Sequence, residues 1–176
     1  MAKIAFTKLG LTKAAESATK TVEINGQSIE VKQYLPINDK LDLIANVLNQ
    51  SADDNNFANP IKLDVFTSLE IVFAYTNISF TEKQKEDLVK LYDLLESNGI
   101  SNAIIAEIPK AEYTAIVDGV VECANAVYTY RNSVMGILDT ITQDYDTLNF
   151  DVNSLRDKLS SAENLTLLKD IMTKLG

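Results

Sequence analysis

Apolar side chains recur three and four residues apart from Tyr113 to Ile141, and this pattern constrains the fold more than any other feature of the chain. Such spacing places apolar residues on one face of an α-helix. The pattern predicts a helix over residues 110–142, about nine turns or roughly 50 Å long. A helix of this length either spans a whole bundle or extends to meet a partner. Arg131 interrupts the apolar stripe, and Gly136 weakens it locally.

Shorter helices are predicted on both sides of this segment. Asn38 is expected to cap the first, Asn59 before Pro60 to start the second, and Thr81 with Gln84 to form a capping box for the third. The second helix is apolar nearly all round, which is typical of a helix at the centre of a fold. A glycine at position 99 predicts a left-handed stop. The expected helices cover about residues 38–50, 60–75, 82–98, 101–107, 152–159 and 162–175.

The N-terminal part of the chain is predicted to form β-structure. Val22 and Ile24 alternate with polar residues, as do Ile29 and Val31, and Asn25-Gly26 lies between the two runs. Asn-Gly supplies the two positive-φ residues that a type I′ hairpin turn requires. The sequence therefore predicts a β-hairpin, which must pack on the helices or on another chain because an isolated hairpin is only marginally stable.

These elements together predict a mainly α (α+β) fold. We expect a helical bundle with a small N-terminal antiparallel β-hairpin or meander. Residues 1–36 would form the β element, with residues 3–9 alternating weakly and the second strand continuing to Pro36. Residues 37–176 would form the bundle, and the two parts together one folded unit.

The absence of histidine from the sequence argues against most classes of enzyme. The chain has no histidine and no tryptophan, and a single cysteine. Histidine is the usual general base and the commonest metal ligand. Cys123 therefore has no imidazole to activate it, and its place in a helical pattern predicts a buried small hydrophobic residue. We expect no catalytic residue and no cofactor.

Charge and hydropathy narrow the class of partner. The net charge is −9, which disfavours direct binding to a phosphate backbone. No segment reaches the roughly 18 apolar residues of a membrane span, so no membrane contact is expected. Two acidic clusters, at residues 53–56 and 144–151, are interpreted as solvated loops rather than metal sites. Two alternatives remain open: an acidic inhibitor of a host defence system that mimics nucleic acid, and a metal-assisted hydrolase that uses Asp144 to Asp151.

Contact with other proteins is the kind of function that these exclusions leave. An exposed hairpin edge could capture a partner by strand addition, and tyrosine with arginine on the long helix could anchor an interface. Free strand edges and long apolar stripes also favour homo-oligomerisation. The candidate partner-binding residues are Val22, Ile24, Ile29, Val31, Tyr34, Tyr128, Tyr130 and Arg131.

The segment TVEINGQSIEVKQYLP, residues 21–36, followed by Asn38-Asp39-Lys40-Leu41, resembles the start of small phage and prophage proteins of low-GC Gram-positive bacteria. In several tail assembly chaperone families a hairpin of this form runs into leucine-proline and then into helices. The resemblance implies a non-enzymatic protein of virion morphogenesis, either a tail assembly chaperone-like factor or a structural component of head, neck or tail. It also implies partners among other phage proteins, in the bacterial host cytoplasm during assembly or in the virion.

Overall fold

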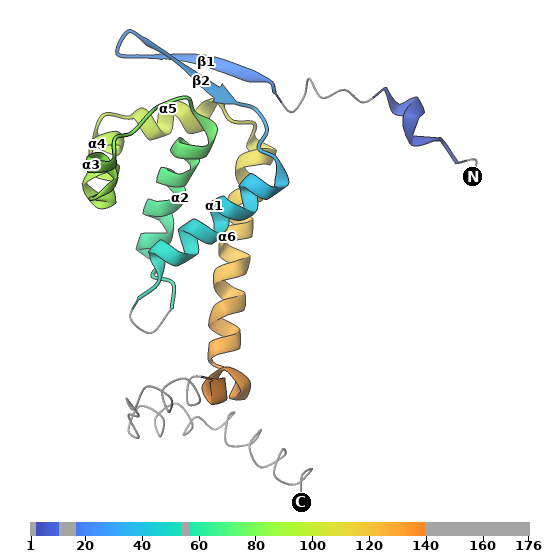
Figure 1. The fold of residues 1–176 in the computed structure, drawn as a ribbon, viewed down its shortest axis with the longest axis vertical. Helices are drawn as coiled ribbons and strands as arrows, with labels where there is room; N and C mark the ends of the chain where they lie inside the picture. The colour runs from blue at the N-terminus through green and yellow to red at the C-terminus, as the bar shows by residue number, and fades with distance from the viewer. Residues whose placement is uncertain (1–2, 11–16, 54–56, 140–176) are drawn as a thin grey trace, which may run out of the picture. The chain divides into compact units, whose positions relative to one another are not determined.

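The computed structural model describes residues 3–10, 17–53 and 57–139. This part of the chain is mainly helical, with a small antiparallel sheet near the N-terminus (Figure 1), which confirms the predicted fold class. The chain divides into two compact units, Met1–Val121 and Glu122–Gly176. The elements are η1 (Phe6–Leu9, a 3₁₀ helix), β1 (Thr19–Ile24), β2 (Gln27–Lys32), α1 (Ile37–Ser51), α2 (Pro60–Tyr75), α3 (Glu82–Lys85), α4 (Leu88–Ser97), α5 (Ile100–Glu107) and α6 (Lys110–Arg131).

The predicted hairpin is confirmed at its turn. Asn25 and Gly26 both have positive φ, 51° and 76°, as a type I′ turn requires. Strand β1 pairs with β2 in the register that places Val22 opposite Ile29. Two expectations about its surroundings are wrong: β2 ends at Lys32 rather than continuing to residue 36, and residues 6–9 form η1 instead of an alternating strand.

Local capping signals place most helix starts correctly. The side chain of Asn59 accepts hydrogen bonds from the backbone N–H groups of Ile61 and Lys62, at 2.9 and 3.2 Å. Thr81 and Gln84 form the predicted capping box at the start of α3. The predicted cap at Asn38 is wrong, because α1 begins at Ile37, with Pro36 in the cap position and no capping side chain.

The predicted third helix consists of two helices, α3 and α4, because a second cap lies inside it. Asp87 has a non-helical backbone (φ −129°, ψ 82°), and its side chain accepts a hydrogen bond from the N–H of Lys90 at 3.0 Å. Aspartate competes with the helix in this way and favours cap positions over helix interiors. Gly99 has φ 69° and ends α4 in the left-handed conformation that the sequence predicts.

The long predicted helix over 110–142 is also interrupted, and its last residues, 140–142, lie outside the described part. Helix α6 ends at Arg131, after 22 residues. Ser133 then caps a new helical segment over 134–139: its Oγ accepts from Gly136 N at 3.2 Å, and its C=O accepts from Ile137 N at 3.0 Å. An apolar stripe alone therefore did not reveal the break, which depends on a serine in cap position.

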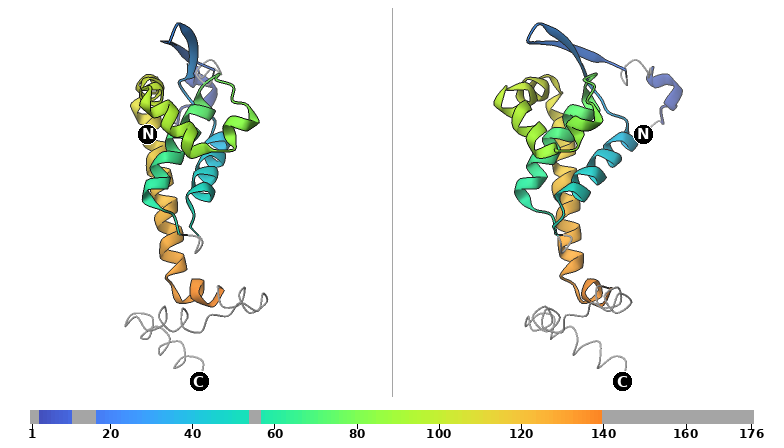
Figure 2. Two further views of the ribbon diagram at one scale, coloured as in Figure 1. Left: turned by 90° about the vertical axis from the view of Figure 1, so that its left-hand side faces the viewer. Right: turned by 60° about the vertical axis from the view of Figure 1, so that its left-hand side comes forward.

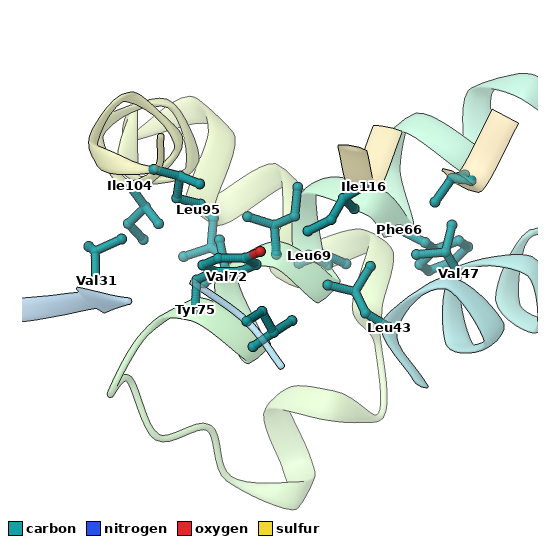
Figure 3. Packing of buried hydrophobic residues seen from close by; sticks show 14 of the residues in the cluster. Val31, Leu43, Val47, Phe66, Leu69, Val72, Tyr75, Leu95, Ile104 and Ile116 are labelled. Atoms are coloured by element: carbon teal, nitrogen blue, oxygen red, sulfur yellow. The ribbon is translucent and has the colours of Figure 1, made fainter. Parts of the chain in front are cut away.

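Helix α2 lies at the centre of unit Met1–Val121, as its composition predicts. It packs along α1, and it also contacts α4 and α5 (Figure 2). Its buried residues interdigitate with those of the neighbouring helices and of β2 (Figure 3). The buried core cluster consists of Val31, Leu35, Leu43, Val47, Phe66, Leu69, Ile71, Val72, Tyr75, Leu91, Leu95, Ile104, Ile108, Ile116 and Val120.

An apolar residue of α1 and the cysteine that the sequence predicts to be buried are both exposed. On α1 the buried line passes through Leu43 and Val47, and Leu41 is 57% exposed. On α6 the buried line passes through Val120 and Ala124, and Cys123, about 60° from Val120 and about 100° from Ala124 around the helix axis, is exposed. Leu41 lies outside the buried face of α1. Cys123 lies beside the apolar stripe of α6, whose members Val120 and Ala124 are buried as their spacing predicts.

Candidate interaction surface

The outer edge of β1 is the first candidate surface, and the ladder geometry shows which of its backbone groups are available. Gln33 N donates to Ala18 O at 2.9 Å, in line with the strand register. Along each strand of an antiparallel pair, residues whose backbone groups bond to the partner strand alternate with residues whose backbone groups point away from it. Since Ala18 bonds to Gln33, the even-numbered residues of β1 are the ones that bond to β2. The N–H and C=O groups of Thr19, Thr21 and Glu23 therefore point away from β2. Among the described residues, no strand pairs with this edge.

The outer edge of β2 is covered by the segment that follows α2. Val31 forms an isolated antiparallel bridge with Thr76. Beside it, Glu30 N donates to Asn77 Oδ1 at 3.1 Å, and Lys32 Nζ donates to Ala74 O at 2.9 Å. The hairpin is thus anchored along one edge, and the opposite edge, on β1, is left open.

The four apolar side chains of the hairpin face the chain's own core. Val31 is fully buried, and Val22, Ile24 and Ile29 are half-buried against the core cluster. These side chains hold the hairpin in place, so they are not the part of it that a partner would contact. Of the two parts of the hairpin that the sequence offers to a partner, the apolar side chains are turned toward the core, and the backbone edge of β1 is left as the candidate surface.

Tyr34 and Glu112 belong to a polar cluster below the hairpin. Glu112 Oε1 accepts three hydrogen bonds: from Leu35 N at 2.8 Å, from Tyr75 Oη at 3.0 Å and from Lys40 Nζ at 2.8 Å. The Lys40 ammonium also lies 4.6 Å from the ring centroid of Tyr34, a cation–π contact. One carboxylate therefore ties the chain after β2 to α1, α2 and α6.

Two pKa shifts follow from this cluster. Burial opposes ionisation of Glu112, but hydrogen bonds from Lys40, the Leu35 amide and Tyr75 outweigh it and lower the pKa of this carboxyl. The pKa of the Tyr75 phenol is raised above its usual value. Burial is the larger cause, and the hydrogen bond to Glu112 is the second. Both groups keep the protonation states that the hydrogen bonds need, so the cluster is a structural anchor.

The predicted aromatic anchors on α6 are exposed, as an interface residue must be. Tyr128 is 61% exposed, and Tyr130 is 51% exposed. The Tyr130 hydroxyl donates a hydrogen bond to Asp139, across the turn that ends α6. Arg131, the last residue of α6, is half-buried. These three residues lie in unit Glu122–Gly176 and the hairpin lies in the other unit, so each candidate surface is described by itself.

One pair of residues has the sequence spacing of a known catalytic pair. Ser17 and Lys20 have the spacing of a Ser-Lys pair, but the Lys20 ammonium lies 3.6 Å from Glu107 Oε2 and its side chain is largely exposed. A lysine base needs a desolvated site. No group of three or more Asp, Glu or Cys side chains gathers as a metal site in the described part. Of the predicted acidic clusters, residues 54–56 and 144–151 lie outside it.

The sequence pattern did not reveal two acids that the fold covers, Glu70 almost completely and Glu112 in large part. Glu112 anchors the hairpin, and Glu70 of α2 is buried beside Asn46 and Gln50 of α1. A glutamate inside an apolar helix has no local pattern that sets it apart from a surface glutamate. The spacing of Asn46 and Gln50, four residues apart on one helix face, was the available signal for the second site.

Within residues 3–10, 17–53 and 57–139, none of the helices combines the length and hydrophobicity that a bilayer crossing requires. The chain was also compared with known proteins. No protein-family model matches it, and neither a curated protein nor a solved structure does.

Proposed function

We propose that this chain is a non-enzymatic phage or prophage protein that acts in virion morphogenesis by binding other proteins. Its most specific assignment is a tail assembly chaperone-like factor, with a structural role in head, neck or tail as the neighbouring one. The sequence resemblance of residues 21–36 and the helices that follow supports the assignment to phage proteins.

The open outer edge of β1 is the observation that carries the proposed mode of action. Its outward-pointing backbone groups, at Thr19, Thr21 and Glu23, form the template that an extended peptide needs to add a third strand. Main-chain hydrogen bonds recognise an extended conformation with little dependence on sequence. This mode of binding suits a factor that holds an unfolded or aggregation-prone partner.

Co-expression with candidate partners tests the proposal. The candidate partners are the proteins encoded by the neighbouring genes, among which the proposal expects tail-tube and tape-measure proteins. The measured quantities are the partner's soluble fraction and its co-elution with this chain. Wild type is expected to raise the soluble fraction and to co-elute. Thr21→Pro removes one outward N–H without removing a bond to β2, so it is expected to abolish both effects.

Thr21→Val is the matched control, because it changes the same side chain and keeps the N–H. It is expected to behave as wild type. Circular dichroism shows whether Thr21→Pro remains folded. If it does not, backbone amide hydrogen exchange of wild type decides: new protection at Thr19, Thr21 and Glu23 in the complex supports strand addition, and unchanged exchange contradicts it. The proposal also fails if neither neighbouring protein binds.

A further inference from the structure

An open pocket lies between α1, α2 and the segment from Thr76 to Leu88, with a volume of about 660 Å³. Its walls combine polar groups of α1 with a carboxylate and aromatic rings. The residues that matter for its chemistry are Asn46, Gln50, Glu70, Phe73, Phe80 and Lys85.

Glu70 gives the pocket a buried carboxylate that has hydrogen-bond donors but no counter-charge. The residue is only 8% exposed. Its Oε1 accepts from Gln50 Nε2 at 2.9 Å and its Oε2 from Asn46 Nδ2 at 3.3 Å, and no described lysine or arginine forms a salt bridge with it. A buried carboxylate held by neutral amides alone is costly, and a cation beside it would offset that cost.

Gln50 supplies an independent sign that a donor is missing. Its Oε1 is buried and has no hydrogen-bond partner, although its Nε2 is bound to Glu70. A buried acceptor without a donor is unusual and calls for an explanation. Gln50 and Glu70 line the same pocket, and a rotation of the Gln50 side chain that turns Oε1 toward the pocket would let one bound group with several N–H donors satisfy both.

Two phenylalanines complete the recognition chemistry. The rings of Phe73 and Phe80 meet edge to face, with centroids 5.0 Å apart and an angle of 66° between their planes. Aromatic rings attract an organic cation and also contact its alkyl chain. A divalent metal ion binds several oxygen ligands, most of them carboxylates. This pocket offers only one carboxylate and two amides, which suits an organic cation better.

The surroundings of the pocket are acidic. A smaller pocket of about 310 Å³ shares Asn46, Glu70 and Phe73 with the first and adds Asp39 and Asp42. Neither aspartate forms a salt bridge within the described residues.

Two lysines at the margins of these pockets offset only part of their negative charge. Lys32 Nζ is bound to Ala74 O at 2.9 Å, and Lys85 Nζ lies 3.7 Å from Glu82 Oε1. Glu82 offsets the charge of Lys85, and the charge of Lys32 is outnumbered by the carboxylates of Glu70, Asp39 and Asp42, so the two pockets together keep an excess of negative charge.

We propose that this pocket binds an alkylammonium or alkylguanidinium group, with Glu70 as the counter-ion, Gln50 Oε1 as an additional acceptor and the Phe73–Phe80 pair as the aromatic wall. The cation is either a free small molecule or the side chain of a lysine or arginine on a partner. The site does not use the β1 edge, so the proposed function can fail without affecting it.

Titration of the full chain with butylguanidinium and butylammonium chloride tests the proposal. The side-chain NH₂ signals of Asn46 and Gln50 are followed by NMR. Saturable shifts are expected, with a midpoint on the order of 1–10 mM for so small a ligand, and they should weaken as salt is added. Butylurea, which has a similar shape and no charge, is expected to cause no saturable shift. Absence of shifts with both cations, or equal shifts with butylurea, overturns the proposal.

Variants assign the charge to Glu70. Glu70→Gln removes the charge and keeps hydrogen-bonding capacity, so it is expected to weaken butylguanidinium binding at least about tenfold. Asp93→Asn, an exposed change on α4, is the control and should leave the midpoint unchanged. Equal affinities of the two variants contradict the proposal. If Glu70→Gln does not fold, Asp42→Asn takes its place with a smaller expected loss, and the butylurea comparison on wild type remains decisive.

A short peptide, Gly-Gly-Arg-Gly-Gly, distinguishes the two sources of the cation. Binding at least as tight as that of butylguanidinium assigns the pocket to a partner's side chain. Exclusion of the peptide, with butylguanidinium still bound, assigns it to a free small cation.

Discussion

At the scale of single residues, Glu112 has the largest structural effect that the geometry predicts. Three donors from different segments of unit Met1–Val121 converge on one of its oxygens. Its side chain is only 10% exposed, and that of Lys40 is 14% exposed. Removal of one member of such a buried set leaves the other members desolvated and unpaired.

Glu112→Ala is expected to lower the free energy of unfolding by about 3 kcal/mol, because it leaves the Lys40 ammonium and the Tyr75 hydroxyl without their acceptor. Urea unfolding measures the change. Glu122→Ala, an exposed position further along α6, is the control, and a change within about 0.5 kcal/mol is expected there. Similar losses in the two variants would contradict the role assigned to Glu112.

The lowered pKa of Glu112 predicts a pH dependence of stability. The folded state holds the ionised form more strongly than the unfolded state does. The stabilisation is therefore complete above the unfolded pKa of about 4.3 and is lost as the pH falls through the lower, folded pKa. Urea titrations at a series of pH values measure this dependence. As the pH falls below about 5, the free energy of unfolding is expected to fall more steeply for wild type than for Glu112→Gln. Parallel curves for the two proteins would contradict this prediction.

At the scale of elements, short side-chain caps set the helix starts. Asn59 bonds two backbone N–H groups at the start of α2, the central helix of its unit. Asn59→Ala is expected to cost about 1 kcal/mol of stability, and Asn59→Asp to retain most of it. Thermal unfolding of the two variants checks this. An alanine variant as stable as the aspartate variant would show that the cap contributes nothing.

The end of α6 depends on a glycine. A Cβ at Gly136 would lie 2.2 Å from the backbone oxygen of Tyr130 and 2.8 Å from Arg131 Cα, so the backbone would have to move. Gly136→Ala is expected to destabilise the turn by more than about 1 kcal/mol, measured by urea unfolding, despite the higher helix propensity of alanine.

Gly119 provides the matched control for this prediction. A Cβ there meets only the end of the Ile44 side chain, at 2.9 Å from Cδ1, and a flexible side chain can adjust. Gly119→Ala is therefore expected to be neutral or stabilising because alanine favours the helix. If Gly136→Ala were equally well tolerated, the turn would not depend on close backbone approach.

At the scale of the whole molecule, protection from hydrogen exchange should follow burial. Amides of α2 near Leu69 and Val72, which are almost fully buried, are expected to exchange slowest. The outward-pointing amides of Thr19, Thr21 and Glu23 are expected to exchange fast, because no described strand pairs with them. Exchange followed by NMR checks both ends of this range. Slow exchange at all three β1 amides in the isolated chain would show that something already covers the edge.

The success of sequence reasoning followed the range of the interactions involved. The Asn25-Gly26 turn, the Asn59 cap, the Thr81 capping box and the Gly99 stop were all predicted. Each depends on contacts within about four residues of the chain. The two unpredicted helix breaks also depend on local contacts. Asp87 and Ser133 each carry a capping signal that the stronger apolar pattern concealed.

The candidate sites were only partly predictable. The hairpin strands were visible in the sequence, but which edge stays open is decided by residues 74–77, more than forty positions away. The pocket around Glu70 exists because α1 lies along α2. Neither the open edge of β1 nor the pocket around Glu70 can be predicted from the local pattern of residues.

The sequence by itself determined the helices, the hairpin and the balance between them, because backbone preferences and capping act within a few residues. The tertiary structure decided how far burial extends around each helix, as the exposure of Leu41 and Cys123 shows. It also decided which strand edge is open and where buried carboxylates meet their donors. Burial and pairing are properties of two surfaces in contact, and the sequence of one element does not specify the surface that covers it.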